Sequence, residues 1–210
     1  MNGGVYVISH IRGGGEKGND WYKGGYKETK PNSWKDVIAT AEYLIKEKIS
    51  NPKKIGIFGA SAGGIAVGRA ITERPDLFKV MLCSVGDLNV SRIKETPNGP
   101  NNMKEYGNPD IEKEFYGLYE MDAYQHIQKG VNYPACLIDV GMNDARVAPW
   151  ISGKFVAKLR ENSISKNPIL FCVDYEAGHQ KTSTDLIKQY ANQFAFAFWQ
   201  MGHPKFKLKK

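Results

Sequence analysis

Five short apolar segments limit how this 210-residue chain can fold. They are continuously apolar rather than alternating between apolar and polar side chains, which is typical of strands buried on both faces of a parallel sheet. The segments are VYVISHI (5–11), KIGIFGA (54–60), KVMLCSV (79–85), ACLIDVG (135–141) and ILFCVDY (169–175). Because parallel strands are joined by crossover connections, the pattern predicts helices between the segments.

Helical periodicity occurs between these segments, as a parallel sheet requires. Residues 33–48 present one apolar face, formed by Trp34, Val37, Ile38, Ala41, Leu44 and Ile45. Ser33, with Asp36 three residues later, is predicted to cap the start of this helix. Residues 184–201 are predicted to form the last helix. Strands alternating with helices indicate an α/β fold, with a mostly parallel sheet and helices on both faces.

The length of the chain is that of one domain, and we expect residues 1–210 to form a single α/β unit. One long interruption, residues 86–130, separates the third and fourth predicted strands. It is rich in Asn, Pro and Glu and contains several aromatic residues. Insertions of this size at the carboxyl edge of a sheet commonly shape a cleft, so we expect this one to lie over the functional site.

Composition and charge exclude several functional classes. With 41% hydrophobic and 24% charged residues, the chain is that of a folded globular protein. The formal net charge is +7, but Lys and Arg are scattered, which favours a solvated basic surface over nucleic-acid binding. No apolar run approaches the roughly 18 residues of a membrane span, and no signal peptide is visible. We therefore expect a cytoplasmic protein without a membrane partner.

The three cysteines, Cys83, Cys136 and Cys172, each lie in an apolar run. Their number is odd and the spacing of metal motifs is absent, which predicts buried free thiols rather than disulfides or a metal site. Near the start of the chain, Gly13, Gly15 and Gly18 match the dinucleotide pattern G-x-G-x-x-G. No helix begins within this loop, as phosphate binding would require, so we expect a tightly packed loop and no cofactor.

The second predicted strand ends in GIFGASAGG, which contains Gly59-x-Ser61-x-Gly63. A strand, a sharp turn and a helix in this order form a nucleophile elbow, which exposes the serine hydroxyl at the edge of the sheet. The backbone N–H of Ala62 would then point towards an oxyanion. The alternative is an ordinary glycine-rich turn with an incidental serine.

A nucleophilic serine needs a general base and an acidic residue that orients the base. Asp144 follows the fourth predicted strand and His179 follows the fifth, which is the chain order expected after such an elbow. Asp139 lies inside its strand, and we expect it to face a neighbouring loop or helix end. The remaining histidines are more typical of surface or packed positions; they are His10, His126 and His203.

These motifs resemble the catalytic α/β-hydrolase domain of the prolyl oligopeptidase family of serine peptidases. The resemblance covers nearly the whole chain in collinear order, through RGGGEKGNDWYKGG, FGASAGG, EYGNPD, NDARVAPW and EAGHQ. It implies that Ser61 is the nucleophile, that Asp144 orients the imidazole, and that His179 is the base. It also implies that Arg146 anchors a substrate carbonyl and that Val147 belongs to the same substrate-binding site. The alternative for Arg146 is a surface or ion-paired side chain.

The chain also departs from the family pattern. The aromatic platform of the family's proline pocket falls on Gly117, and Tyr116 and Tyr119 are the candidates to replace it. The family's propeller, its leading strands and a tyrosine that donates to the oxyanion have no counterpart in the sequence. We therefore expect an N-terminally truncated hydrolase fold that acts through an acyl-enzyme on small ester or short peptide-like substrates. A non-catalytic binding module is the alternative.

The missing strands bear on assembly. Without them, the segment 5–11 is expected either to pair directly with the strand 54–60 or to leave an edge that a second copy covers. We favour a homodimer.

Overall fold

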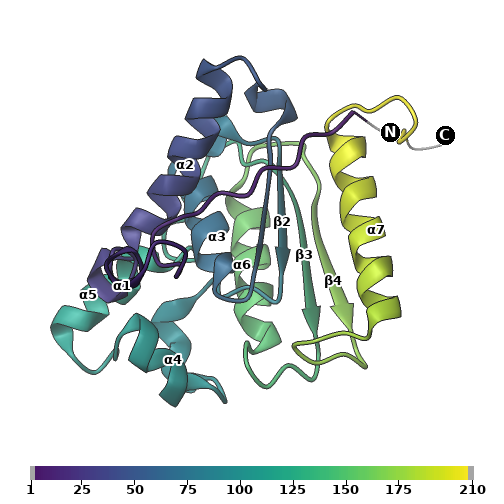
Figure 1. The fold of residues 1–210 in the computed structure, drawn as a ribbon. Coiled ribbons are helices and arrows are strands. Elements are labelled where there is room, and N and C mark those ends of the chain that lie inside the picture. Colours follow the sequence, from purple (N-terminus) through teal and green to yellow (C-terminus); the bar gives the residue numbers. More distant parts are fainter. Residues whose placement is uncertain (1–2, 208–210) are drawn as a thin grey trace.

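The computed structural model describes residues 3–207, and its centre is a four-stranded parallel sheet (Figure 1). The strand order follows the chain, with β1 and β4 at the two edges. The strands are β1 (Gly56–Ala60), β2 (Val80–Ser84), β3 (Ala135–Gly141) and β4 (Ile169–Asp174). The α-helices are α1 (Asn19–Lys23), α2 (Pro31–Lys46), α3 (Gly63–Glu73), α4 (Gly99–Tyr106), α5 (Glu112–Met121), α6 (Pro149–Asn162) and α7 (Ser183–Gln200). Short 3-10 turns are η1 (Lys27–Thr29), η2 (Pro52–Lys54), η3 (Pro75–Leu77) and η4 (Val90–Glu95).

Helices cover both faces of the sheet, as the apolar strands predicted. Successive residues of β2 alternate between the two faces: Met81 packs into the core on the side of α3 and α6, whereas Leu82 packs with Phe196 of α7. In Figure 1, α7 lies alone on one side of the sheet, and α2, α3 and α6 lie on the other. The α/β prediction is confirmed, including four of the five predicted strands and the last helix.

The predicted first strand, residues 5–11, is wrong. This segment has no regular secondary structure and does not pair with β1, so the proposed direct pairing of 5–11 with 54–60 is also wrong. Its apolar side chains are exposed, with 76% of Val5 and 70% of Ile8 accessible to solvent. Figure 1 shows it running from the C-terminal end of α7 to α1. The homodimer remains a prediction.

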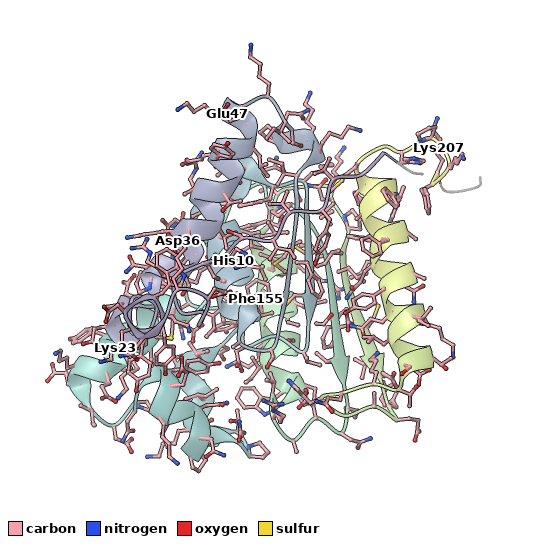
Figure 2. The ribbon with its side chains drawn as sticks, in the orientation of Figure 1. His10, Lys23, Asp36, Glu47, Phe155 and Lys207 are labelled. Carbon is pink, nitrogen blue, oxygen red and sulfur yellow. The ribbon has the colours of Figure 1, made fainter. Side chains whose placement is uncertain are left out.

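The glycine-rich loop packs against α2. The expectation that no helix begins there is wrong, because the short helix α1 starts directly after Gly18. Ser33 does not cap this helix, which begins two residues earlier at Pro31; its hydroxyl donates to the backbone oxygen of Arg12 at 2.6 Å. Asp36 accepts hydrogen bonds from the backbone and the guanidinium of Arg12. A Cβ on Gly25 would come within 2.4 Å of the same Arg12 oxygen, so only glycine allows the loop to cross itself there. Figure 2 shows Asp36 on α2 near the segment that carries His10.

The insertion, residues 86–130, forms η4, α4 and α5 and lies near the carboxyl ends of the strands (Figure 1). The loop and the insertion are joined by Tyr22, whose hydroxyl donates to Glu105 of α4 at 2.6 Å. Two of the three cysteines are buried as predicted, but Cys172 is exposed because it lies on the edge strand β4. Within residues 3–207, no helix combines the length and the apolar character needed to cross a membrane.

Candidate active site

Ser61 lies between the end of β1 and the start of α3, as the elbow motif predicts. Its backbone has a φ of +53°, in the left-handed region that a non-glycine residue seldom adopts. Two backbone hydrogen bonds hold this turn. Ser61 N–H donates to the backbone oxygen of Ser84 at 3.0 Å, and Asp87 N–H donates to the backbone oxygen of Ser61 at 3.0 Å. The strained conformation is therefore fixed by the end of the neighbouring strand β2.

The small residues around Ser61 allow close approach of backbone segments. A Cβ on Gly59 would lie 2.5 Å from the oxygen of Gly63, and one on Gly64 would lie 2.6 Å from the Cα of Gly86. By contrast, a Cβ on Gly63 would meet no atom within 4 Å. The glycines that the elbow needs are thus Gly59 and Gly64, and α3 can begin directly against the segment that follows β2.

Asp144 and His179 are brought together from two loops at the carboxyl ends of β3 and β4. Nδ1 of His179 lies 2.8 Å from Oδ2 of Asp144, whose side chain is fully buried. The other oxygen of Asp144 accepts the backbone N–H groups of Arg146 at 2.8 Å and Val147 at 2.9 Å. A carboxylate held in this way can fix the orientation of an imidazole and leave Nε2 to exchange a proton.

Ala62 and the Ser61 hydroxyl lie at the open side of the elbow. Ala62 is exposed, and within residues 3–207 its backbone N–H donates no hydrogen bond, so it can point to an incoming oxygen. Among residues 3–207, no hydrogen bond joins Oγ of Ser61 to the ring of His179. Such bonds are often long before substrate binds.

The two candidate substrate-binding residues after Asp144 differ in environment. Arg146 is exposed, and its guanidinium forms no ion pair with any residue between 3 and 207. Val147 is 4% exposed and belongs to the main hydrophobic core. Arg146 can therefore reach a ligand, whereas Val147 contributes its backbone N–H to Asp144.

Asp139, the other acidic residue considered for the site, forms hydrogen bonds elsewhere. The carboxylate of Asp139 faces the side of α7, where it accepts hydrogen bonds from Gln189 and Gln193 and from the hydroxyl of Ser84. Burial raises the pKa of this carboxyl.

The other three histidines interact with residues outside the site. His10 Nδ1 lies 3.3 Å from Glu16 Oε1, and His126 Nδ1 lies 2.9 Å from the backbone oxygen of Asp122. The ring of His203 contacts the ring of Phe198.

The geometry can be compared with known proteins. The sequence model of the prolyl oligopeptidase family matches residues 1–204. This chain belongs to the prolyl oligopeptidase family. It is 34% identical over 204 residues to a prolyl endopeptidase of Elizabethkingia miricola, covering 96% of this chain and 29% of that protein. It is 35% identical over 205 residues to dipeptidyl aminopeptidase BI of Pseudoxanthomonas mexicana, covering 94% and 28%.

Solved structures of the prolyl oligopeptidase family have the same fold as this chain. Oligopeptidase B from Leishmania major superposes with a TM-score of 0.88 at 35% identity, covering 92% of this chain and 28% of that one. Prolyl oligopeptidase B from Galerina marginata, bound to a 35mer substrate, gives 0.87 at 35% identity, covering 95% and 28%. The fold is therefore an α/β-hydrolase domain, and the chain spans less than a third of the length of these relatives.

Gly117, the predicted position of the aromatic platform, lies on α5, and a Cβ there would lie 3.7 Å from the backbone of Glu28. Tyr116 and Tyr119 of the same helix are 62% and 42% exposed. Tyr119 lies 5.4 Å from the ring of His126, measured between ring centroids. Both tyrosines are therefore accessible on the surface of the insertion, but between residues 3 and 207 no hydrogen bond joins either of them to Ser61.

Two cavities of the structure are not lined by Ser61, Asp144 or His179. One, of about 180 Å³, lies between α7 and the sheet; it is lined by Asp139, Cys172, Lys181 and Gln189, among others. The other, of about 560 Å³, lies between η1 and α5 and is lined by Tyr22, Tyr26, Lys27 and Glu114, among others. In the second cavity Lys27 is paired with Glu114 at 2.8 Å, so its charge is already balanced.

Sequence reasoning missed Asp87, which follows β2 directly beneath the elbow. The side chain is 2% exposed, and Tyr106 at the end of α4 donates its hydroxyl to Oδ2 at 3.1 Å. Burial raises the pKa of Asp87 to about 6, and the hydrogen bond from Tyr106 opposes this shift. An acidic residue three positions after the end of a buried strand is the signal in the sequence that could identify it.

Proposed function

We propose that this chain is the catalytic domain of a serine peptidase of the prolyl oligopeptidase family and that it cleaves acyl bonds through an acyl-enzyme. The observation that carries the proposal is the hydrogen bond between His179 and the buried Asp144 at the same end of the sheet as Ser61. Family membership supports it, because the relatives include prolyl endopeptidases.

In the proposed reaction, Oγ of Ser61 attacks the substrate carbonyl carbon while Nε2 of His179 accepts the hydroxyl proton. The carbonyl oxygen becomes an oxyanion, which the N–H of Ala62 stabilises. The bond to the leaving group then breaks, and His179 returns the proton to that group. Water then attacks the acyl carbon while the imidazole accepts a proton from it. The bond from the acyl carbon to Oγ breaks, the acid product leaves, and His179 returns the proton to Ser61. Asp144 keeps the imidazole in the required orientation throughout.

The substrate class that we propose is short peptides and small activated esters. The relative from Galerina marginata was solved with a 35mer hydrolysis and macrocyclization substrate, which supports a peptide ligand. The exposed Arg146 supports an anchor for a backbone carbonyl of that peptide. Small activated esters are included because their cleavage needs less oxyanion stabilisation than that of amides.

A direct comparison of two substrates tests this preference. We expect the chain to hydrolyse a short p-nitrophenyl ester faster than a prolyl-amide dipeptide, with both activities absent in Ser61→Ala. Release of p-nitrophenol and of the amine would be followed by absorbance under the same conditions. Faster amide cleavage would overturn the ester preference and leave the peptidase assignment intact. If neither substrate is turned over, the non-catalytic binding module becomes the better account.

A further inference from the structure

The segment that follows β2, residues 85–87, holds the nucleophile elbow in place through hydrogen bonds. Besides the bond from Asp87 N–H to the oxygen of Ser61, Ser152 of α6 donates its hydroxyl to the oxygen of Gly86 at 3.2 Å. Val85 has a φ of +45°, an uncommon conformation for a β-branched residue, which indicates that this turn is held in place by its surroundings. Any shift of Asp87 would therefore be transmitted to Ser61.

The side chain of Asp87 connects this segment to the insertion. Tyr106, which is 4% exposed, ends α4 and reaches Oδ2 with its hydroxyl. Oδ1 is buried and accepts no hydrogen bond from any residue between 3 and 207. A continuous path thus runs from α4 through Tyr106 and Asp87 to the backbone of Ser61.

Charged and titratable groups from several elements surround Asp87. Lys30, which precedes α2, and Arg146, from the loop after β3, both favour its ionised form. Asp144, from the same loop, disfavours it. The thiol of Cys83 on β2 is also close enough for the charge of Asp87 to raise its pKa. Lys30 is buried, and its ammonium lies 3.7 Å from Glu105.

We propose that Asp87 is a positioning residue, which in its ionised form couples the insertion through Tyr106 to the nucleophile elbow and holds Ser61 ready for attack. This inference rests on the proposed function. The physical reason is that a hydrogen bond to a carboxylate is shorter and stronger than one to a neutral carboxyl group. Protonation also turns an acceptor into a donor within a buried site. The reactivity of Ser61 therefore falls when Asp87 takes up a proton.

The pH dependence of Ser61 acylation tests the proposal. We would measure the rate constant for labelling by a fluorophosphonate across the acid range, in wild type, Asp87→Asn and Tyr106→Phe. In wild type the acid limb should contain an ionisation of Asp87. Asp87→Asn keeps an acceptor for Tyr106 but cannot titrate, so its limb should contain one ionisation fewer than that of wild type. Tyr106→Phe removes a bond that lowers the pKa of Asp87, so its limb should move to higher pH.

A matched control separates positioning from general loss of packing. Tyr133 is also fully buried, and its hydroxyl accepts the N–H of Gln128 at 2.8 Å, away from the elbow. Tyr133→Phe should therefore leave the shape of the pH profile unchanged. Profiles of wild type, Asp87→Asn and Tyr106→Phe that coincide would overturn the proposal while leaving the proposed function standing. A wild type that is never labelled would remove both. If Asp87→Asn does not fold, an unshifted limb in Tyr106→Phe is sufficient to overturn it.

The pH dependence of the free energy of unfolding measures the same ionisation and needs no activity assay. The pKa of Asp87 is raised from 3.8 in an unfolded chain to about 6 in the fold, so the folded state binds more protons within this window. The contribution of Asp87 to the free energy of unfolding therefore falls as pH rises from about 4 to about 6. The stability of Asp87→Asn relative to wild type should rise over that window and level off above it. A constant difference would show that Asp87 does not titrate there, and would overturn the proposal.

Discussion

Asp144→Asn is expected to lower kcat for ester hydrolysis by about 10⁴-fold while leaving the fold intact. The amide has nearly the same shape as the carboxylate, so it can still accept the N–H groups of Arg146 and Val147. It cannot stabilise the imidazolium that forms on His179, and its NH₂ group favours the wrong tautomer of the ring. The measurement is steady-state kinetics, with circular dichroism to compare the folds.

A surface variant controls for the removal of a carboxylate in general. Asp76 lies on η3 and forms a solvent-exposed ion pair with Arg74, so Asp76→Asn should keep wild-type kcat. A fall of less than tenfold in Asp144→Asn would contradict the role given to this residue and would require a different acid for His179.

Gly64→Ala should strongly destabilise the fold, whereas Gly63→Ala should not. The new Cβ at position 64 would lie 2.6 Å from the Cα of Gly86 and 2.7 Å from the nitrogen of Asp87, and backbone atoms cannot move aside as a flexible side chain can. Overpacking of this kind typically costs about 1–3 kcal/mol. In a domain of this size, that corresponds to a fall in Tm of about 2–12 °C.

The adjacent position makes a sharp control, because both residues lie in the first turn of α3. A Cβ at Gly63 meets open space, and alanine is the better helix former, so the Tm should stay the same or rise slightly. Thermal unfolding followed by circular dichroism would decide. Equal Tm values for the two variants would show that α3 does not pack against the segment after β2 as described.

The parts of the fold that the sequence predicted well are those where local pattern and burial agree. Residues Ala135–Gly141 are continuously apolar and form β3, buried on both faces with those same bounds. The elbow was predictable because a strand, small residues and a helix follow each other without interruption at Ser61. The pairing of Asp144 with His179 followed from chain order, since both come directly after neighbouring parallel strands.

The failures come from tertiary context that a local pattern does not contain. VYVISHI has the composition of a strand, but a strand needs a hydrogen-bonding partner, and between residues 3 and 207 none pairs with this segment. Ser33 and Asp36 have the spacing of a helix cap, yet the loop at Arg12 uses both side chains. Asp87 and Tyr106 are 19 positions apart in sequence, and only the path of the insertion brings them into contact.

The site of covalent labelling tests directly whether Ser61 is the nucleophile. Wild-type chain would be treated with a fluorophosphonate, its intact mass measured, and the labelled peptide identified by mass spectrometry. We expect a single adduct on the peptide that contains Ser61 and no adduct in Ser61→Ala. We also expect His179→Ala to be labelled far more slowly, because the hydroxyl has then lost its base. Labelling that persists in Ser61→Ala, or a folded wild type that is never labelled, would contradict the assignment of Ser61 as the nucleophile.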